Sequence, residues 1–214
     1  MRVDVVFDTI CPWCYVGKRR LEAARLLRPN VEITPRWRPF LLNPDMPGEG
    51  MERDTYLVRK FGTEARVRRI YGAIGDAGQS VEIDFAFDRI RQTPNSVNSH
   101  RLVQFAENHG QTNAVADAVV EALFLNYFIN GKDIGDDDVL IKIGVDIGLD
   151  ENKLGDYLSS DEDVSFVYEE NARAHRRGIN SVPSYVLGGS MVISGAHEPQ
   201  VLARLIDAAA APSA

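Results

Sequence analysis

The sequence predicts an α/β fold in which a strand, a helix and a second strand come first, helices fill the middle, and two strands and a helix come last. Three observations lead to this prediction. Apolar runs near both ends of the 214-residue chain have the length and composition of buried strands. Amphipathic helical patterns fill the sequence between them. Both cysteines of the chain lie together, where the first strand is followed by a helix.

The first strand is expected at residues 3–7, which form a short apolar run. Asp8 and Thr9 then offer turn or cap chemistry. A helix is expected from Pro12 to Arg28, because proline suits a first helical turn, where its missing N–H would be unpaired in any case. The strand-to-helix step therefore coincides with the cysteines.

A second strand is indicated by Val31, Ile33 and Trp37 and ends at Pro39. A loop follows at 43–50. Helices are then expected at 52–61, 64–75, 96–109, 112–129, 136–147, 150–158 and 161–177. Residues 81–87 alternate between apolar and polar, which is typical of a strand or of an extended segment on the core. A hairpin at 181–193, turning at Gly188-Gly189, and a last helix at 198–210 complete the chain.

Composition and charge exclude several classes of protein. With 44% hydrophobic and 26% charged residues, the chain resembles soluble globular proteins. Its net charge of -7 argues against a general nucleic-acid surface or an anionic membrane surface as a partner. No apolar run reaches membrane-spanning length, and the first residues do not resemble a secretory signal. We therefore expect a cytoplasmic protein with no nucleic-acid and no membrane partner.

The two cysteines form the motif Cys11-Pro12-Trp13-Cys14. A structural zinc site needs four ligands, and the four histidines are scattered, so we expect no metal. A disulfide closing so small a loop would constrain the unfolded chain little. The alternative without chemistry is that both cysteines are buried and pack as small apolar side chains. Because the pair opens a helix, whose amino terminus favours an anion, we favour redox chemistry with Cys11 as the nucleophile and Cys14 as the resolving thiol.

Three segments carry a resemblance to a known family: residues 7–18 with the cysteine motif, residues 93–102, and residues 178–185 with Val182-Pro183. Together they resemble the DsbA family of the thioredoxin superfamily, and within it the FrnE-like cytoplasmic branch. This resemblance implies a thioredoxin-like fold formed by residues 1–42 and 178–214. It also implies an inserted all-helical domain at 43–177, whose last helix leads back into the thioredoxin-like domain.

The resemblance implies thiol–disulfide exchange at Cys11 and Cys14, without a cofactor beyond this redox pair. It also implies a cis bond before Pro183, which would turn the backbone of Val182 towards Cys11 and let it pair with an extended substrate strand. The chain departs from the family at Val5, where thioredoxin and DsbA carry a buried acid. Asp8 or water would then have to exchange the proton of Cys14.

Candidate substrate-binding residues, besides Val182 and Pro183, are Pro12, Trp13, Asn95 and His100. Trp13 is expected to be partly exposed, as a substrate platform or as a packing residue. His100, with its neighbour Arg101, faces either the active-site groove or solvent. Asn95 contacts substrate or serves the start of the following helix.

Three functions remain open at this stage. The first is a protein thiol–disulfide oxidoreductase or isomerase that acts on protein thiols and disulfides. The second is a glutathione-dependent isomerase or transferase, similar to 2-hydroxychromene-2-carboxylate isomerase and the kappa-class glutathione transferases, which typically have Ser at the position of Cys11. The third is a chaperone-like module that binds peptides. Glutathione is a candidate co-substrate, and the sequence leaves monomer and homodimer open.

Overall fold

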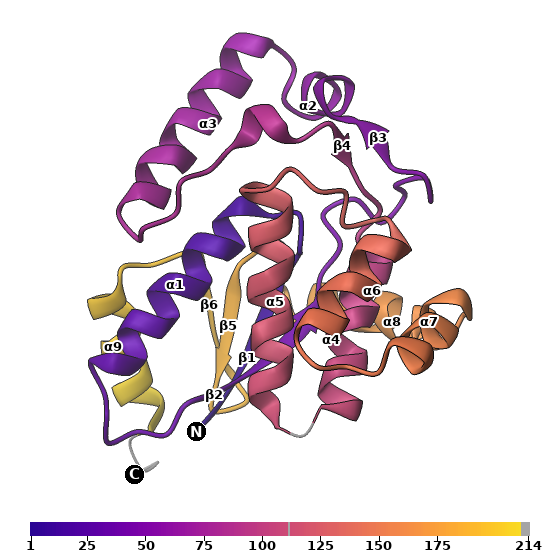
Figure 1. Cartoon of the computed structure of the whole chain (residues 1–214). Helices are drawn as coiled ribbons and strands as arrows, with labels where there is room; N and C mark the ends of the chain where they lie inside the picture. Colours follow the sequence, from indigo (N-terminus) through magenta and orange to yellow (C-terminus); the bar gives the residue numbers. More distant parts are fainter. Residues whose placement is uncertain (111, 211–214) are drawn as a thin grey trace.

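The computed structural model describes residues 1–110 and 112–210, so residues 211–214 at the end of the expected thioredoxin-like segment lie outside the described residues. It confirms a mixed α/β fold of the thioredoxin type (Figure 1). The strands are β1 Arg2–Phe7, β2 Thr34–Pro39, β3 Met51–Glu52, β4 Gln92–Thr93, β5 Ser184–Leu187 and β6 Met191–Ser194. The helices are α1 Pro12–Leu26, α2 Arg53–Phe61, α3 Glu64–Gln79, α4 Val97–His109, α5 Asn113–Phe128, α6 Asp137–Asp146, α7 Glu151–Ser159, α8 Val164–Arg176 and α9 Pro199–Ala210.

The central sheet has the strand order β2-β1-β5-β6. β1 runs parallel to β2, since α1 carries the chain back between them, and antiparallel to β5. In this register Val5 lies opposite Trp37 on one side and opposite Tyr185 on the other. The first and last segments of the chain therefore share one sheet, as the sequence predicted.

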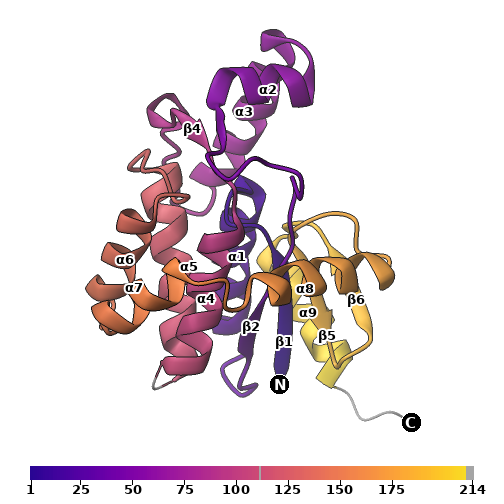
Figure 2. The same ribbon diagram turned by 90° about the vertical axis from the view of Figure 1, so that its right-hand side faces the viewer.

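The two faces of the sheet pack against different helices because alternate side chains of a strand point to opposite faces. Val3, Val5 and Phe7 belong to the core formed with α1, α5 and α9. Val6 instead packs against α8, in a smaller cluster with Ala174 and other apolar side chains. Figure 2 shows α8 crossing this second face of the sheet. Helices thus cover β1, the strand that leads to the cysteines, on both faces.

One continuous core joins the sheet to the helices of the middle segment. Buried apolar side chains of β1, α1, α4, α5, α7 and α9 form a single cluster. A buried charge reinforces the contact of α1 with α5. The ammonium of Lys18 pairs with Glu22 on its own helix and lies 3.6 Å from Asp117 and 3.1 Å from Glu121 of α5. Burial opposes the charge of Lys18, but these carboxylates raise its pKa above the ordinary value.

The hairpin of α2 and α3 has a small core of its own. Its buried side chains are Met46, Tyr56, Leu57 and Val67. Arg53, at the start of α2, is buried and donates hydrogen bonds to the hydroxyls of Tyr71 at 2.7 Å and Tyr127 at 3.1 Å. Since Tyr127 lies on α5, this arginine ties the hairpin to the rest of the molecule.

Three predictions need correction. The segment 43–177, expected to be all-helical, also holds a two-stranded antiparallel sheet of β3 and β4. The second strand begins at Thr34, because the N–H of Val31 still donates to Arg28 in the turn after α1. The alternating segment 81–87 forms no ladder. The rings of Phe85 and Phe87 stack 4.9 Å apart, and the N–H of Ala86 donates to the end of α5. Of the two alternatives, the extended segment on the core is the correct one.

Arg101 serves the fold and lies away from the cysteines. Its guanidinium is 1% exposed and donates to four backbone carbonyls at and beyond the end of α7, those of Tyr157, Leu158, Ser160 and Glu162. The last carbonyls of a helix have no partner inside the helix, so a buried helix end needs such donors. Arg101 therefore anchors α7 to α4.

We expect Arg101→Ala to lower the free energy of unfolding by about 3 kcal/mol, since several buried carbonyls would lose their donors. Arg68→Ala is the matched control. Arg68 is 72% exposed and pairs with Glu64 one turn away, so its loss should change the stability by less than about 0.5 kcal/mol. Urea denaturation measures both. Equal midpoints for the two variants would show that Arg101 does not hold α7.

Candidate active site

Cys11 caps the amino terminus of α1. The chain leaves β1 at Phe7, turns, and brings the N–H of Cys11 to the carbonyl of Asp8 at 3.0 Å. Cys11 has extended backbone angles, with φ of -93° and ψ of 111°, and Pro12 takes the first helical turn as predicted. The sulfur thus lies at the positive end of the helix, where unpaired N–H groups stabilise an anion.

The two thiols lie at different depths. Cys11 is 5% exposed and Cys14 is 1% exposed, and both are free thiols. Burial raises the pKa of Cys14 well above its ordinary value, and the hydrogen bond and charge of Cys11 raise it further. Cys11 is therefore the sulfur nearer to a partner molecule, and Cys14 is held behind it as a thiol.

The loop before β5 faces Cys11. The bond between Val182 and Pro183 is cis, as the family resemblance implied, and the Cys11 thiol lies 3.8 Å from the carbonyl oxygen of Val182. The next carbonyl, that of Pro183, accepts from Gly195 at 2.8 Å and belongs to the sheet. Gly17 permits this approach, since a Cβ there would lie 2.8 Å from the ring of Pro183.

Asp8 is a fully buried carboxylate just before the cysteines. It accepts from the N–H of Leu42 at 2.7 Å and of Ile10 at 3.2 Å. Its charge is also close enough to Cys14 to raise the pKa of that thiol, although less than burial and Cys11 do. The chain thus has a buried acid near the inner cysteine, at a position different from that of the family's acid.

His100 contacts this carboxylate and is closed to solvent. Its ring is 1% exposed, and Nε2 lies 3.2 Å from the carbonyl of Phe40 and 3.6 Å from Oδ1 of Asp8. Direct contact between His100 and a substrate would require this packing to open. Among the described residues, its Nδ1 is buried without a hydrogen-bond partner. His100 is therefore placed to orient Asp8.

The other candidate residues are divided between the surface and the scaffold. Trp13 is 36% exposed, beside Cys11 at the helix start, as a platform for a partner molecule would be. The amide of Asn95 donates to Met46 at 2.8 Å and accepts from Val97 at 2.9 Å, so it joins the 43–50 loop to the start of α4. Sequence reasoning missed Tyr185, because no motif marks it. This buried residue lies two positions after Pro183, and its burial and the charges of both cysteines raise the pKa of its hydroxyl.

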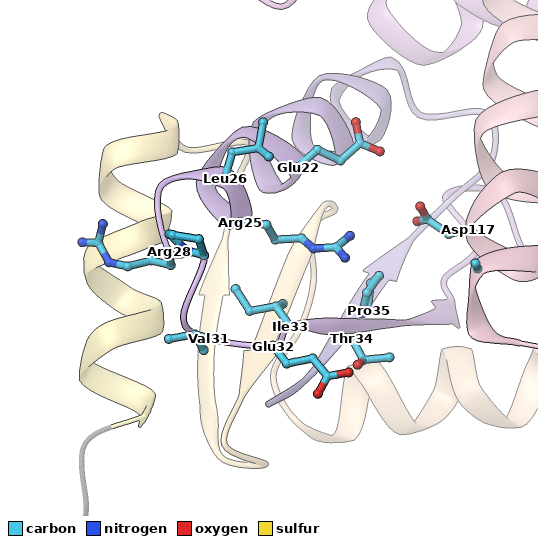
Figure 3. Close-up of a pocket in the computed structure, with 12 residues that line it drawn as sticks. Glu22, Arg25, Leu26, Arg28, Val31, Glu32, Ile33, Thr34, Pro35 and Asp117 are labelled. Carbon is cyan, nitrogen blue, oxygen red and sulfur yellow. The ribbon is translucent and has the colours of Figure 1, made fainter.

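Two cavities differ in their relation to the cysteines. A cavity of about 530 Å³ lies between the carboxyl end of α1 and the start of β2, with Arg25 and Asp117 among its walls (Figure 3). That place is at the end of α1 opposite to Cys11. A cavity of about 380 Å³ is lined by Leu42, whose N–H binds Asp8, and has Arg59 and Lys60 in its wall. Neither cavity is lined by a cysteine, and the second adjoins the site through Leu42.

Some groups are absent from the described part of the chain. In residues 1–110 and 112–210, no three His, Cys, Asp or Glu side chains gather as a metal site would require. Over the same residues, no helix has the length and apolar character needed to cross a membrane.

Comparison with known proteins agrees with this geometry. The model of the DSBA-like thioredoxin domain family matches residues 2–207. A probable DsbA oxidoreductase from Streptomyces coelicolor is 25% identical and superposes with a TM-score of 0.90 over 100% of this chain and 92% of its own. A 2-hydroxychromene-2-carboxylate isomerase has 19% identity and a TM-score of 0.72, covering 97% and 94% of the two chains. The cytosolic disulfide reductase DsbM from Pseudomonas aeruginosa, solved with glutathione, has 16% identity and a TM-score of 0.66, covering 98% and 95%.

The different depths of the thiols can be measured by alkylation. Cys11→Ser leaves only Cys14, whose raised pKa keeps it protonated at neutral pH. We expect iodoacetamide to modify this variant at least about tenfold more slowly at neutral pH than Cys14→Ser, because the thiolate is the reactive form. The rate for Cys14 should keep rising as the pH is raised above 9. Equal rates in the two variants at neutral pH would contradict the assignment of an outer and an inner thiol.

Proposed function

Because the chain belongs to the DSBA-like thioredoxin domain family, we propose that it is a thiol–disulfide oxidoreductase with Cys11 as the attacking thiol and Cys14 as the resolving thiol. One observation carries this proposal. Cys11 occupies the N-cap position of α1, its sulfur lies 3.8 Å from the carbonyl oxygen of Val182, and the Cys14 thiol lies behind it. A structural pair of thiols would need neither the helix end nor this loop.

The reaction has two exchange steps. The thiolate of Cys11 attacks one sulfur of a substrate disulfide, forms a mixed disulfide, and releases the other substrate sulfur as a thiolate. Cys14 then loses its proton and attacks the sulfur of Cys11. The bond between Cys11 and the substrate breaks, the second substrate thiolate leaves and takes up a proton, and the protein holds a disulfide. Oxidation of a substrate dithiol is the reverse sequence.

The loop before β5 supports binding of an extended substrate. The Val182 carbonyl faces Cys11, so a chain joined to Cys11 can pair with this backbone as an additional strand pairs with a sheet. Trp13 and Pro12 border the same sulfur, and the exposed indole offers an apolar surface to the substrate. Asn95 and His100 contribute indirectly, by positioning the 43–50 loop and Asp8.

Asp8 is the candidate acceptor for the proton of Cys14. A buried thiol with a raised pKa cannot attack until a base removes its proton, and the pKa contribution of Asp8 places its carboxylate close to Cys14. Its two hydrogen bonds from Leu42 and Ile10 keep the carboxylate oriented. Asp8 thus takes the role of the family's buried acid. The position that this acid usually occupies holds Val5 in this chain.

Glutathione-dependent isomerisation is the second candidate. The similarity in fold to a 2-hydroxychromene-2-carboxylate isomerase and to a disulfide reductase solved with glutathione favours it. In this chain, however, Cys14 lies directly behind Cys11, an arrangement that single-thiol chemistry does not require. We therefore rank dithiol exchange first, with glutathione as a candidate co-substrate beside protein thiols and disulfides.

We also propose a cytoplasmic location, which the cytosolic disulfide reductase of similar fold supports. In that reducing compartment a pair of this kind acts catalytically or as a sensor. Membership of the FrnE-like branch, the domain boundaries and a chaperone-like activity stay predictions from the sequence, which leaves monomer and homodimer open.

The roles of the two cysteines can be separated with dithiobis(nitrobenzoate). We expect the reduced protein to release one nitrothiobenzoate as Cys11 attacks and a second as Cys14 resolves the mixed disulfide. Cys14→Ser should release only the first. Cys11→Ser should also lose the acceleration of insulin reduction by dithiothreitol, measured as turbidity. Unchanged insulin reduction in Cys11→Ser would falsify the proposed function, and glutathione-dependent isomerisation that survives Cys14→Ser would favour the second candidate.

The role of Asp8 can be tested with Asp8→Asn. If the carboxylate accepts the proton of Cys14, the second release of nitrothiobenzoate should slow at least about tenfold at neutral pH, with the first release unchanged. If Asp8 acted only through its charge, the substitution would lower the pKa of Cys14 and speed the second release. The sign of the change therefore decides between the two roles, and urea denaturation controls for loss of folding.

A further inference from the structure

One buried hydroxyl near the cysteines has no hydrogen-bond partner. Tyr185 lies on β5, opposite Val5 of β1, and is 1% exposed. Its Oη is buried and makes no hydrogen bond within the described part of the chain. Leaving a buried hydroxyl unpaired costs about 1–3 kcal/mol, so its presence in a packed core requires an explanation.

The hydroxyl lies where α1 and the loop before β5 meet. A Cβ at Gly17 would lie 2.5 Å from Oη of Tyr185 and 2.8 Å from Cγ of Pro183. Gly17 is three residues after Cys14, which is about one helical turn, so the hydroxyl touches the backbone of α1 on the side of Cys14. The charges of Cys14, Cys11 and Arg20 all act on the phenol at this place.

We propose that the Tyr185 hydroxyl donates a hydrogen bond to the thiolate of Cys14 when that thiolate forms to resolve the mixed disulfide. This inference rests on the proposed function and adds a positioning residue to it. In the dithiol form the inner sulfur is a neutral thiol and only a weak acceptor, and the hydroxyl is unpaired. The thiolate is a strong acceptor, and hydrogen bonds to an ionised group are the stronger ones.

The surroundings of the phenol suit a donor. Burial and the charges of both cysteines raise the pKa of Tyr185, so the hydroxyl keeps its proton and can donate it in a hydrogen bond. Arg20 acts in the opposite direction. The two terminal nitrogens of its guanidinium are bound to Ala196, Ser80 and Glu198, whereas its Nε is buried without a hydrogen-bond partner among the described residues. Asp8, on the chain before α1, would accept the proton, while Tyr185 would stabilise the charge that remains on sulfur.

Tyr185→Phe tests this inference, because it removes only the hydroxyl. We expect the first release of nitrothiobenzoate to change less than about twofold and the second to slow about tenfold at neutral pH, which corresponds to about 1.4 kcal/mol. The pH midpoint of the second release should move up by about one unit, since the charged form of Cys14 loses its donor. Urea denaturation should show no loss of stability, because an unpaired group has been removed.

Tyr157→Phe is the control. The Tyr157 hydroxyl donates to Asp163 at 2.9 Å, far from the cysteines along α7, so its loss should lower the stability and leave both releases unchanged. If Tyr185→Phe releases both equivalents at wild-type rates, or slows both equally, the inference is wrong while the proposed function stands. If the wild-type protein releases only one equivalent, the proposed function fails and the inference fails with it.

Discussion

The carboxyl end of β1 fixes the position of Cys11, and through it the chemistry of the protein. β1 pairs with β5 on one side, so the loop that precedes β5 must end beside the turn that follows β1. Within that turn the N–H of Cys11 binds the carbonyl of Asp8, which starts α1 with a sulfur at its positive end. The same pairing brings the Val182 carbonyl to 3.8 Å from that sulfur. Three features therefore meet at the Cys11 sulfur: a helix end, a buried second thiol and a backbone acceptor. They meet there because two strands distant in sequence pair in one register.

The sequence was most informative where local chemistry decides the structure. Pro12, the apolar run of β1 and the glycine turn of the last hairpin each act over a few residues, and the elements they predicted are present. At 81–87 the alternation allowed either a strand or an extended segment on the core, and the structure has the second. No strand pairs with this segment. The N–H of Ala86 donates to the carbonyl of Phe128, and the rings of Phe85 and Phe87 pack on the end of α5. Pattern alone cannot distinguish these cases, because the partner lies elsewhere in the chain.

The active site shows the same division between local and distant causes. The cysteines could be found from their spacing, and Pro183 from the family resemblance. The contact of His100 with Asp8 joins residues 92 positions apart, and the unpaired hydroxyl of Tyr185 depends on how closely Gly17 lets α1 approach β5. Arg101 directly follows His100 in the sequence but serves the end of α7. Neighbours on a helix therefore need not share a function.

The hairpin of α2 and α3 lies over the end of the sheet at which β1 leads into α1 (Figure 1). Its small core is separate from the main one, and Arg53 is a principal link between them. Exposed residues of this hairpin can therefore change with little effect on the packing around the thiols, whereas Ala77 near the end of α3 packs on the main core. Such changes would alter the surface above the turn that follows β1 and leave the turn itself as it is.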